Sequence, residues 1–235
     1  MRRETQNILL VLLGGALLKI SFTGTYLRYV KPAHLWLLVL AGVVMIALAA
    51  VSIGRELAGR RTSTGDDHHH PGRSAWLLVL PVLAVFLVAP PALGSDSVER
   101  AGDSPPRGSQ RESVSYPPLP AGDVLPLSMS EFVERAAWDA TGSLDGRTVR
   151  LKGFVVHEGD TAYLARLRIF CCAADAFPVK VELVGDAASR FADDSWVEVV
   201  AELVPGSSTE ANHRVPSVTV ESISPIPEPA DPYDH

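Results

Sequence analysis

Residues 148–172 read TVRLKGFVVHEGDTAYLARLRIFCC, and this stretch decides the fold of the C-terminal part of the chain. Apolar and polar side chains alternate from Thr148 to Val156 and again from Ala162 to Cys171. Such period-two alternation is typical of β-strands that turn one face toward a core. Three later segments show the same pattern, at residues 178–183, 196–204 and 218–223. The sequence therefore predicts a domain of five β-strands.

The order of these strands favours a small barrel. Residues 186–191, between the third and fourth strands, are long enough for a short helix. Five strands with a helix in that place is the order of the OB-fold, a Greek-key barrel. Gly153, in the middle of the first strand, suits the bend that such a barrel needs. We expect an OB-like five-stranded barrel, with a five-stranded β-sandwich as the alternative.

The boundaries of this domain follow from composition and from a helix signal. Ser128-Met-Ser-Glu131 is a capping-box pattern and predicts a short amphipathic helix in front of the strands. Residues 95–127 and 225–235 are rich in Pro, Gly, Ser and charge, which indicates disorder. We therefore expect a disordered linker at 95–127, a β domain at 128–224 and a disordered tail at 225–235.

The first 94 residues have the composition of a membrane region. Apolar runs at residues 8–27, 35–53 and 75–94 each approach the roughly 20 residues that cross a bilayer as a helix. We expect three transmembrane helices there. Ala92-Leu93-Gly94 faintly resembles a signal-peptidase site, so release of the C-terminal part by cleavage stays open.

The charges of the two parts differ in sign and predict an orientation. Residues 1–94 carry nine Lys/Arg and four Asp/Glu, whereas the remainder has a net charge of −11. A cytoplasmic N-terminus puts Arg28 and Lys31 outside and the other flanking basic residues inside, at Arg2, Arg3, Arg55, Arg60, Arg61 and Arg73. This places the C-terminal domain outside the cytoplasm, in a multi-pass protein of the cell membrane. The acidic domain also argues against binding of nucleic acid.

Two features of the membrane region are candidate sites. Lys19 falls near the middle of the first apolar run, where an ionisable group marks a functional site or else snorkels outward along the polar residues that follow it. The second is Asp66-Asp67-His68-His69-His70, in the loop expected on the cytoplasmic side. These carboxylates and imidazoles suit a loose transition-metal site, with an exposed, incidental His run as the alternative.

The strongest chemical signal is the pair Cys171-Cys172, which holds both cysteines of the chain. Three interpretations stay open. Cys171 packs inward as a small hydrophobe beside a free Cys172 thiol; or the thiolates bind Zn or another soft transition metal with Asp175 and a histidine, His157 or His213; or the pair forms a labile disulfide. Cys171 follows Leu167 and Ile169 at steps of two residues, so the alternation predicts that Cys171 faces the core with them.

The remaining motifs do not indicate an enzyme. The domain contains Ser, His and Asp, but without the G-x-S-x-G context of a nucleophile elbow. The sequence also lacks a phosphate-binding loop and a dinucleotide fingerprint. We therefore expect a protein that binds rather than catalyses.

Three segments together resemble a known family. They are TGTYLRYVKP at 23–32, WLLVLP at 76–81 with APPALG at 89–94, and RIFCCAADA at 168–176. With them the chain resembles the YcgQ-like family of bacterial membrane proteins, described as permease subunits. The resemblance implies a partner, a larger multi-span permease encoded nearby, and a link to metal homeostasis. Within the family's signature segment it covers Cys171, Cys172 and Asp175.

Two hypotheses of function follow. The first is a non-enzymatic accessory subunit of a membrane transport complex, whose extracytoplasmic domain binds a metal or the partner permease. The alternative is a stand-alone thiol or metal-binding membrane protein that acts as a metallochaperone or redox sensor. A stable co-purifying partner is required by the first hypothesis and not by the second.

Overall fold

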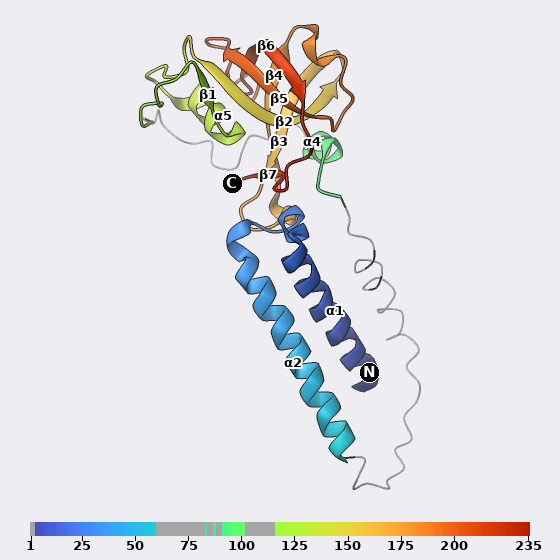
Figure 1. The fold of residues 1–235 in the computed structure, drawn as a ribbon. Helices are drawn as coiled ribbons and strands as arrows, with labels where there is room; N and C mark the ends of the chain where they lie inside the picture. The colour runs from blue at the N-terminus through green and yellow to red at the C-terminus, as the bar shows by residue number, and fades with distance from the viewer. Residues whose placement is uncertain (1–2, 60–82, 84–86, 88–90, 102–115) are drawn as a thin grey trace. The chain divides into compact units, whose positions relative to one another are not determined.

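The structure is a computed structural model that describes residues 3–59, 83, 87, 91–101 and 116–235 (Figure 1). The chain divides into two units, Met1–Pro91 and Ala92–His235. Each unit is considered by itself below.

The first unit is a pair of apolar helices. Helix α1 covers Arg3–Thr23 and α2 covers Leu35–Gly59, with the 3-10 turns η1 (Thr25–Arg28) and η2 (Pro32–His34) between them. The segments Gln6–Thr23 and Pro32–Ala58 are long and apolar enough to cross a membrane. They coincide with the first two expected spans. Most of the third expected span, 75–94, lies outside the described residues.

Glycine allows α1 and α2 to pack closely. A Cβ atom on Gly14 would lie 3.0 Å from the carbonyl oxygen of Gly42, and one on Gly42 would lie 2.9 Å from the side chain of Leu18. The large side chains on the outer surface of α2 are exposed and apolar, among them Trp36, Leu40, Val44, Leu48 and Val51. The pair therefore has an apolar exterior and a tight glycine contact inside.

The second unit is a β domain with short helices. Its elements in chain order are α4 (Ser95–Ala101), β1 (Val124–Pro126), α5 (Met129–Trp138), β2 (Thr148–Glu158), β3 (Thr161–Arg168), η4 (Ala173–Asp175), β4 (Phe177–Val184), η5 (Asp186–Ala188), β5 (Trp196–Leu203), β6 (Ser217–Pro225) and β7 (Tyr233–Asp234). All five expected strands are present, as β2 to β6. The helix expected within 186–191 is a single 3-10 turn.

The strands form one seven-stranded sheet in the order β1-β2-β5-β6-β4-β3-β7, with an additional pairing of β2 and β3. With that additional pairing, the five strands β2, β3, β4, β5 and β6 close into a ring. Within the ring β4 and β6 run parallel, and the other neighbouring strands run antiparallel. Strands β1 and β7 are added in parallel, beside β2 and β3. The sheet therefore differs from the plain five-stranded barrel expected from the sequence.

The approach of β2 to β3 explains the glycine in β2. A Cβ atom on Gly153 would lie 2.5 Å from the carbonyl oxygen of Ala165. Only a residue without a side chain fits at this distance, so Gly153 permits the close contact of the two strands.

The main core lies between the sheet and α5. Phe132 of α5 is fully buried there among the aliphatic side chains of the strands. The N-cap half of the expected capping box is confirmed, because the Ser128 Oγ accepts a hydrogen bond of 3.1 Å from the Glu131 backbone N–H, whereas the Glu131 carboxylate accepts from Arg135. The N-cap hydrogen bond of Ser128 and the burial of Phe132 therefore both stabilise α5.

A second, smaller core covers the other face of β2 and β3. Val98 of α4 and Tyr233 of β7 are buried there. They pack with Phe154, Val156, Ala165, Leu167 and Ile169. Phe154 falls on the polar face of the predicted alternation, yet it is buried because α4 and β7 cover that face.

The expectation of disorder at both ends of the domain is wrong where the structure describes it. Residues 95–101 form α4, and Tyr233–Asp234 form β7 on the edge of β3. Residues 102–115 of the expected linker lie outside the described residues. The side chains of Val98 and Tyr233 hold these two segments in place, because both are buried in the second core. Such isolated residues leave the Pro-rich and charged composition unchanged, which is why composition did not reveal them.

The final part of the linker is also held in place. The Arg135 guanidinium, buried in the domain, donates to the carbonyl of Pro117 at 3.0 Å and stacks on Tyr116. The Arg147 guanidinium donates to the carbonyls of Pro120 and Gly122. The domain therefore includes 116–127 as well as the expected 128–224.

Candidate metal site at the end of β3

The candidate site is the turn that follows β3. The strand ends at Arg168, and the backbone N–H of Ile169 still donates to the Asp234 carbonyl of β7. The next three N–H groups, of Phe170, Cys171 and Cys172, turn instead toward one carboxylate, that of Asp175. The change of acceptor ends the strand and makes the turn.

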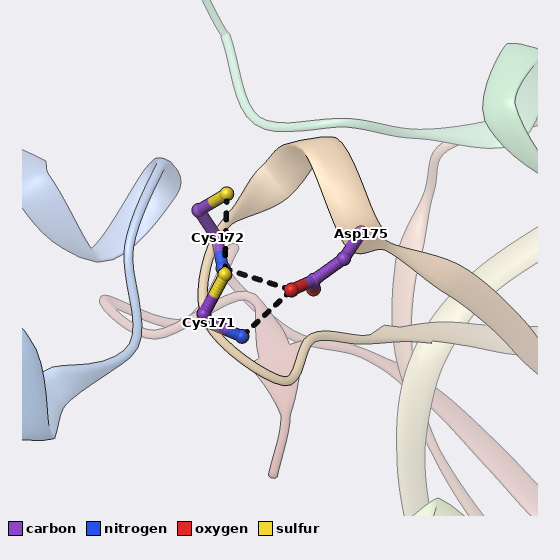
Figure 2. A group of neighbouring side chains, drawn as sticks. All are labelled: Cys171, Cys172 and Asp175. Atoms are coloured by element: carbon purple, nitrogen blue, oxygen red, sulfur yellow. Dashed lines mark hydrogen bonds between the residues drawn. The ribbon is translucent and has the colours of Figure 1, made fainter.

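Asp175 organises this turn. One oxygen, Oδ1, accepts from the Phe170 N–H at 2.8 Å; the other, Oδ2, accepts from the N–H groups of Cys171 at 2.9 Å and Cys172 at 3.4 Å. The 3-10 turn η4 carries Asp175 back over the two cysteines (Figure 2). The carboxylate therefore accepts three backbone hydrogen bonds, and its oxygens are also of the type that zinc accepts as ligands.

Cys171, Cys172 and Asp175 come together as a possible ligand set. Their ligand atoms all lie within 4.8 Å of one another. The two Sγ atoms are 3.6 Å apart, and both thiols are free (Figure 2). Cys171 is exposed, whereas Cys172 and Asp175 are partly buried. Two thiolates and a carboxylate are ligands that zinc accepts in proteins.

Electrostatics in the turn keep one thiol protonated. The hydrogen bond of the Cys171 thiol with the Asp175 carboxylate, with smaller contributions from Cys172 and from burial, raises the pKa of Cys171 to about 12. Burial acts to raise the pKa of Asp175, but the hydrogen bonds from the Cys171 thiol and from the three backbone N–H groups outweigh it and lower that pKa. A cation that binds here must displace the proton of Cys171.

The prediction that Cys171 faces the barrel core is wrong. Ile169 is buried as expected, but Phe170 is 54% exposed and Cys171 is exposed. The alternation fails because the backbone leaves the β3 ladder after Ile169 and bonds to Asp175 instead. Both thiols are therefore accessible from the surface of the turn.

The two histidines proposed as additional ligands lie elsewhere. His213 is in the loop between β5 and β6, with φ of 54°, and is outside the group formed by the two cysteines and Asp175. The side chain of His157 contacts Asp193 instead, with its Nδ1 2.7 Å from a carboxylate oxygen. The structure thus brings together three of the expected residues.

The first unit contained two candidate sites, Lys19 and the run Asp66–His70. Lys19 is exposed and lies four residues before the end of α1 at Thr23, about 6 Å along the axis at 1.5 Å per residue. This position near a helix end favours the snorkelling interpretation over a midplane site. Asp66, Asp67, His68, His69 and His70 lie outside the described residues.

Sequence reasoning also missed an ordered histidine in the segment that follows β6. His235 follows β7, and its Nε2 lies 2.8 Å from the Asp231 Oδ2. The signal was the i, i+4 spacing in DPYDH, which composition assigned to a disordered tail. The pairing of β7 with β3 gives this segment its place.

Two family models match the chain, and the first of them extends past the structural boundary at Pro91 to include α4. Residues 5–103 match the DUF1980 N-terminal domain, and residues 133–234 match the DUF1980 C-terminal domain. The C-terminal match extends through β7. A search of curated proteins gave no match.

One solved structure is similar over part of the chain. It is a crystal structure described as that of an aspartyl-tRNA synthetase from Leishmania major Friedlin, with 14% identity and a TM-score of 0.26. The similarity covers 47% of this chain and 23% of that protein, less than a quarter of its length.

Proposed function

We propose that this chain, which belongs to the DUF1980 family, is an accessory subunit of a membrane transport complex. In this proposal its extracytoplasmic domain binds a soft metal cation. The observation that carries the proposal is the placement of the two thiols and the Asp175 carboxylate within 4.8 Å of one another. The protein acts by binding and presenting the cation, without catalysis.

Several features support a membrane location. The two apolar helices have the length of membrane spans, and their exposed surfaces are apolar. In this proposal the uncharged run that begins at Ala75 supplies a third span, which ends before the expected Gly94, because Leu93 packs in the β domain and its N–H bonds to Tyr233. With the excess of basic residues inside, the N-terminus is cytoplasmic and the β domain is outside.

The ring of β2 to β6 supports an OB-like barrel as the basis of the domain. In this proposal β1 and β7 are additions to that barrel. OB-folds that bind single-stranded nucleic acid use basic grooves, whereas this domain is acidic. The partners we propose are therefore a cation, the bilayer and a multi-span permease.

The ligand set favours Zn²⁺ or another soft transition metal. Thiolates are soft ligands, and tetrahedral zinc accepts sulfur and carboxylate oxygen together. Three ligands from the turn leave a fourth position, as in zinc sites that exchange a ligand. An exposed turn with an open position suits the transfer of a cation to or from a permease.

The alternative is a stand-alone metallochaperone or redox sensor. The 3.6 Å between the two free Sγ atoms favours it. Oxidation to a disulfide would remove two protons and two electrons from the pair. The electrons and protons would pass to the disulfide of a second protein, which would be reduced to two thiols. The two candidates differ in whether a permease remains bound to the protein.

Zinc binding by the full chain in detergent, measured by competition with a chromophoric chelator, tests the proposal. We expect Cys172→Ser and Asp175→Ala each to abolish tight binding, and the exposed control Asp186→Ala to leave it unchanged. Equal zinc content in all variants would overturn the metal assignment. Purification from native membranes then separates the candidates, because only the accessory subunit retains a multi-span partner.

A further inference from the structure

The loop that carries the candidate metal site, residues 169–176, joins the paired ends of β3 and β4. The second half of this loop is anchored by burial, because Ala173 and Ala176 pack against the second core. The first half contains both thiols and includes Phe170. The contacts that hold the first half therefore decide how the thiols are presented.

The side chain of Phe170 lies outside both cores of the domain. Among the described residues of the second unit, Phe170 and Val184 are the large apolar side chains that are exposed, at 54% and 46%. Phe170 packs in neither of the two clusters that the described part of the domain forms. The ring therefore contributes through contacts at the loop rather than through the cores.

Two side chains at the strand ends contact the Phe170 ring. It stacks on the ring of Phe177, the first residue of β4, with centroids 5.4 Å apart and an interplanar angle of 29°. The Arg168 guanidinium lies 5.8 Å from the Phe170 centroid and donates to the Glu134 carboxylate of α5 at 2.6 Å. Stacking and cation–π contacts both favour a particular placement of the ring. Phe170 is thus fastened to the ends of both strands.

The backbone of Phe170 is in turn part of the site. Its N–H donates to the Asp175 Oδ1 at 2.8 Å. The N–H groups of the two cysteines that follow donate to the other oxygen of the same carboxylate. A movement of Phe170 would therefore displace the carboxylate and both Sγ atoms together. The stack on Phe177 opposes such a movement.

The spacing of the thiols matches a small tetrahedral cation. The Sγ atoms of Cys171 and Cys172 are 3.6 Å apart (Figure 2). Two Zn–S bonds of about 2.3 Å at a tetrahedral angle place their sulfur atoms about 3.8 Å apart. A larger soft cation such as Cd²⁺ forms longer bonds to sulfur and requires a wider separation. A loop held at the present spacing therefore favours Zn²⁺ more than a loop that is free to widen.

We propose that Phe170 is a positioning residue of the metal site and sets part of its selectivity. Its ring, stacked on Phe177, holds the two thiols at the spacing of a small tetrahedral cation and opposes the widening that a larger one requires. The inference rests on the proposed metal function, and it names small divalent cations as the class that the site selects.

Dissociation constants of the full chain for Zn²⁺ and Cd²⁺, measured in detergent by competition with a chromophoric chelator, test this assignment. We expect Phe170→Ala to weaken Zn²⁺ binding about three- to tenfold, the range of one stacked pair, and to weaken Cd²⁺ binding less. Phe170→Tyr keeps the stack and should behave as the wild type. Phe170→Leu keeps an apolar side chain without the ring and should behave as Phe170→Ala. Val184→Ala, at the other exposed apolar side chain, is the matched control and should leave both constants unchanged.

The outcomes separate a positioning role from a structural one and separate the two proposals. A merely structural role would lower the melting temperature of the metal-free chain and weaken both cations equally. Because the ring lies outside both cores, we expect that temperature to be unchanged in Phe170→Ala. If Phe170→Ala binds both cations as Val184→Ala does, or weakens both equally, the positioning assignment is overturned and the metal site stands. If the wild type binds neither cation, both proposals are overturned.

Discussion

The Asp194 carboxylate holds Ser95 with both of its oxygens. One accepts the Ser95 backbone N–H at 2.7 Å and the other accepts the Ser95 hydroxyl at 2.8 Å. The two residues are 99 positions apart in the chain. This contact fastens the first residue of α4 to the turn before β5, and with it the Ala92–Gly94 segment that resembles a signal-peptidase site. In the folded domain, the Leu93 N–H is also bonded to the Tyr233 hydroxyl, at 3.2 Å.

Asp194→Ala should release the start of the domain. Loss of two hydrogen bonds to a charged acceptor is expected to cost about 1–3 kcal/mol of the free energy of unfolding. Amide hydrogen exchange should rise most in residues 95–101. Asp194→Asn is the control, because it keeps one acceptor oxygen and tolerates the positive φ of 63° at this position. Unchanged exchange in Asp194→Ala would contradict the role of this contact.

Tyr233→Ala should destabilise the β domain strongly. The ring is buried in the second core, and loss of a buried aromatic side chain costs about 3–5 kcal/mol. Tyr233→Phe keeps the ring and removes the hydroxyl that accepts the Leu93 N–H, so we expect a cost of about 1 kcal/mol. Thermal unfolding of both variants measures the difference. Wild-type stability of Tyr233→Ala would contradict a stabilising role for β7.

Cys171 should react slowly with iodoacetamide at pH 8, because its pKa of about 12 leaves little thiolate. Asp175→Ala removes the largest cause of that shift and should accelerate alkylation of Cys171 by roughly 30-fold, since lower nucleophilicity offsets part of the gain in thiolate. Fragment mass spectra assign the label to Cys171 or Cys172. A rate that does not respond to Asp175→Ala would contradict the thiol–carboxylate hydrogen bond.

Metal affinity should rise with pH. Below a pKa of about 12 the Cys171 thiol is protonated, so a cation that binds the thiolate releases at least one proton. The dissociation constant should therefore fall at least tenfold for each pH unit between pH 6 and 8. Chelator competition at several pH values measures the slope. A slope of zero would show that Cys171 is not a thiolate ligand.

The orientation of the chain is open to a reporter assay. A reporter that is active only outside the cytoplasm should be active when fused after His235 and inactive when inserted at Gly65. The reason is the excess of basic residues in the segments expected on the cytoplasmic side, including Arg60, Arg61 and Arg73. The reverse pattern would contradict an extracytoplasmic β domain.

Local signals in the sequence were sufficient for α1, α2, α5 and the strands β2 to β6, but not for α4, β1 and β7. The alternation in 148–156 and the capping box at Ser128 predicted β2 and α5, because strands and helix starts are determined by neighbouring residues. The apolar runs likewise predicted α1 and α2. The grouping of Cys171, Cys172 and Asp175 was also predictable, since five positions of chain cannot carry these residues far apart.

The order of 95–101 and the place of residues 226–235 were decided by the tertiary structure alone, whereas the exposure of Cys171 follows from a local contact that the alternation does not show. Cys171 leaves the core because Asp175 takes the backbone N–H groups that would otherwise continue the β3 ladder. Val98 and Tyr233 become ordered because they bury against the face of β2 that holds Phe154, a face that alternation in this strand assigns to solvent, and against the apolar face of β3. Contacts between residues about 100 or more positions apart, such as Ser95 with Asp194 and Ser130 with Asp234, leave no periodic trace in the sequence. The free energy that orders these segments comes from surfaces that exist only once the sheet has formed.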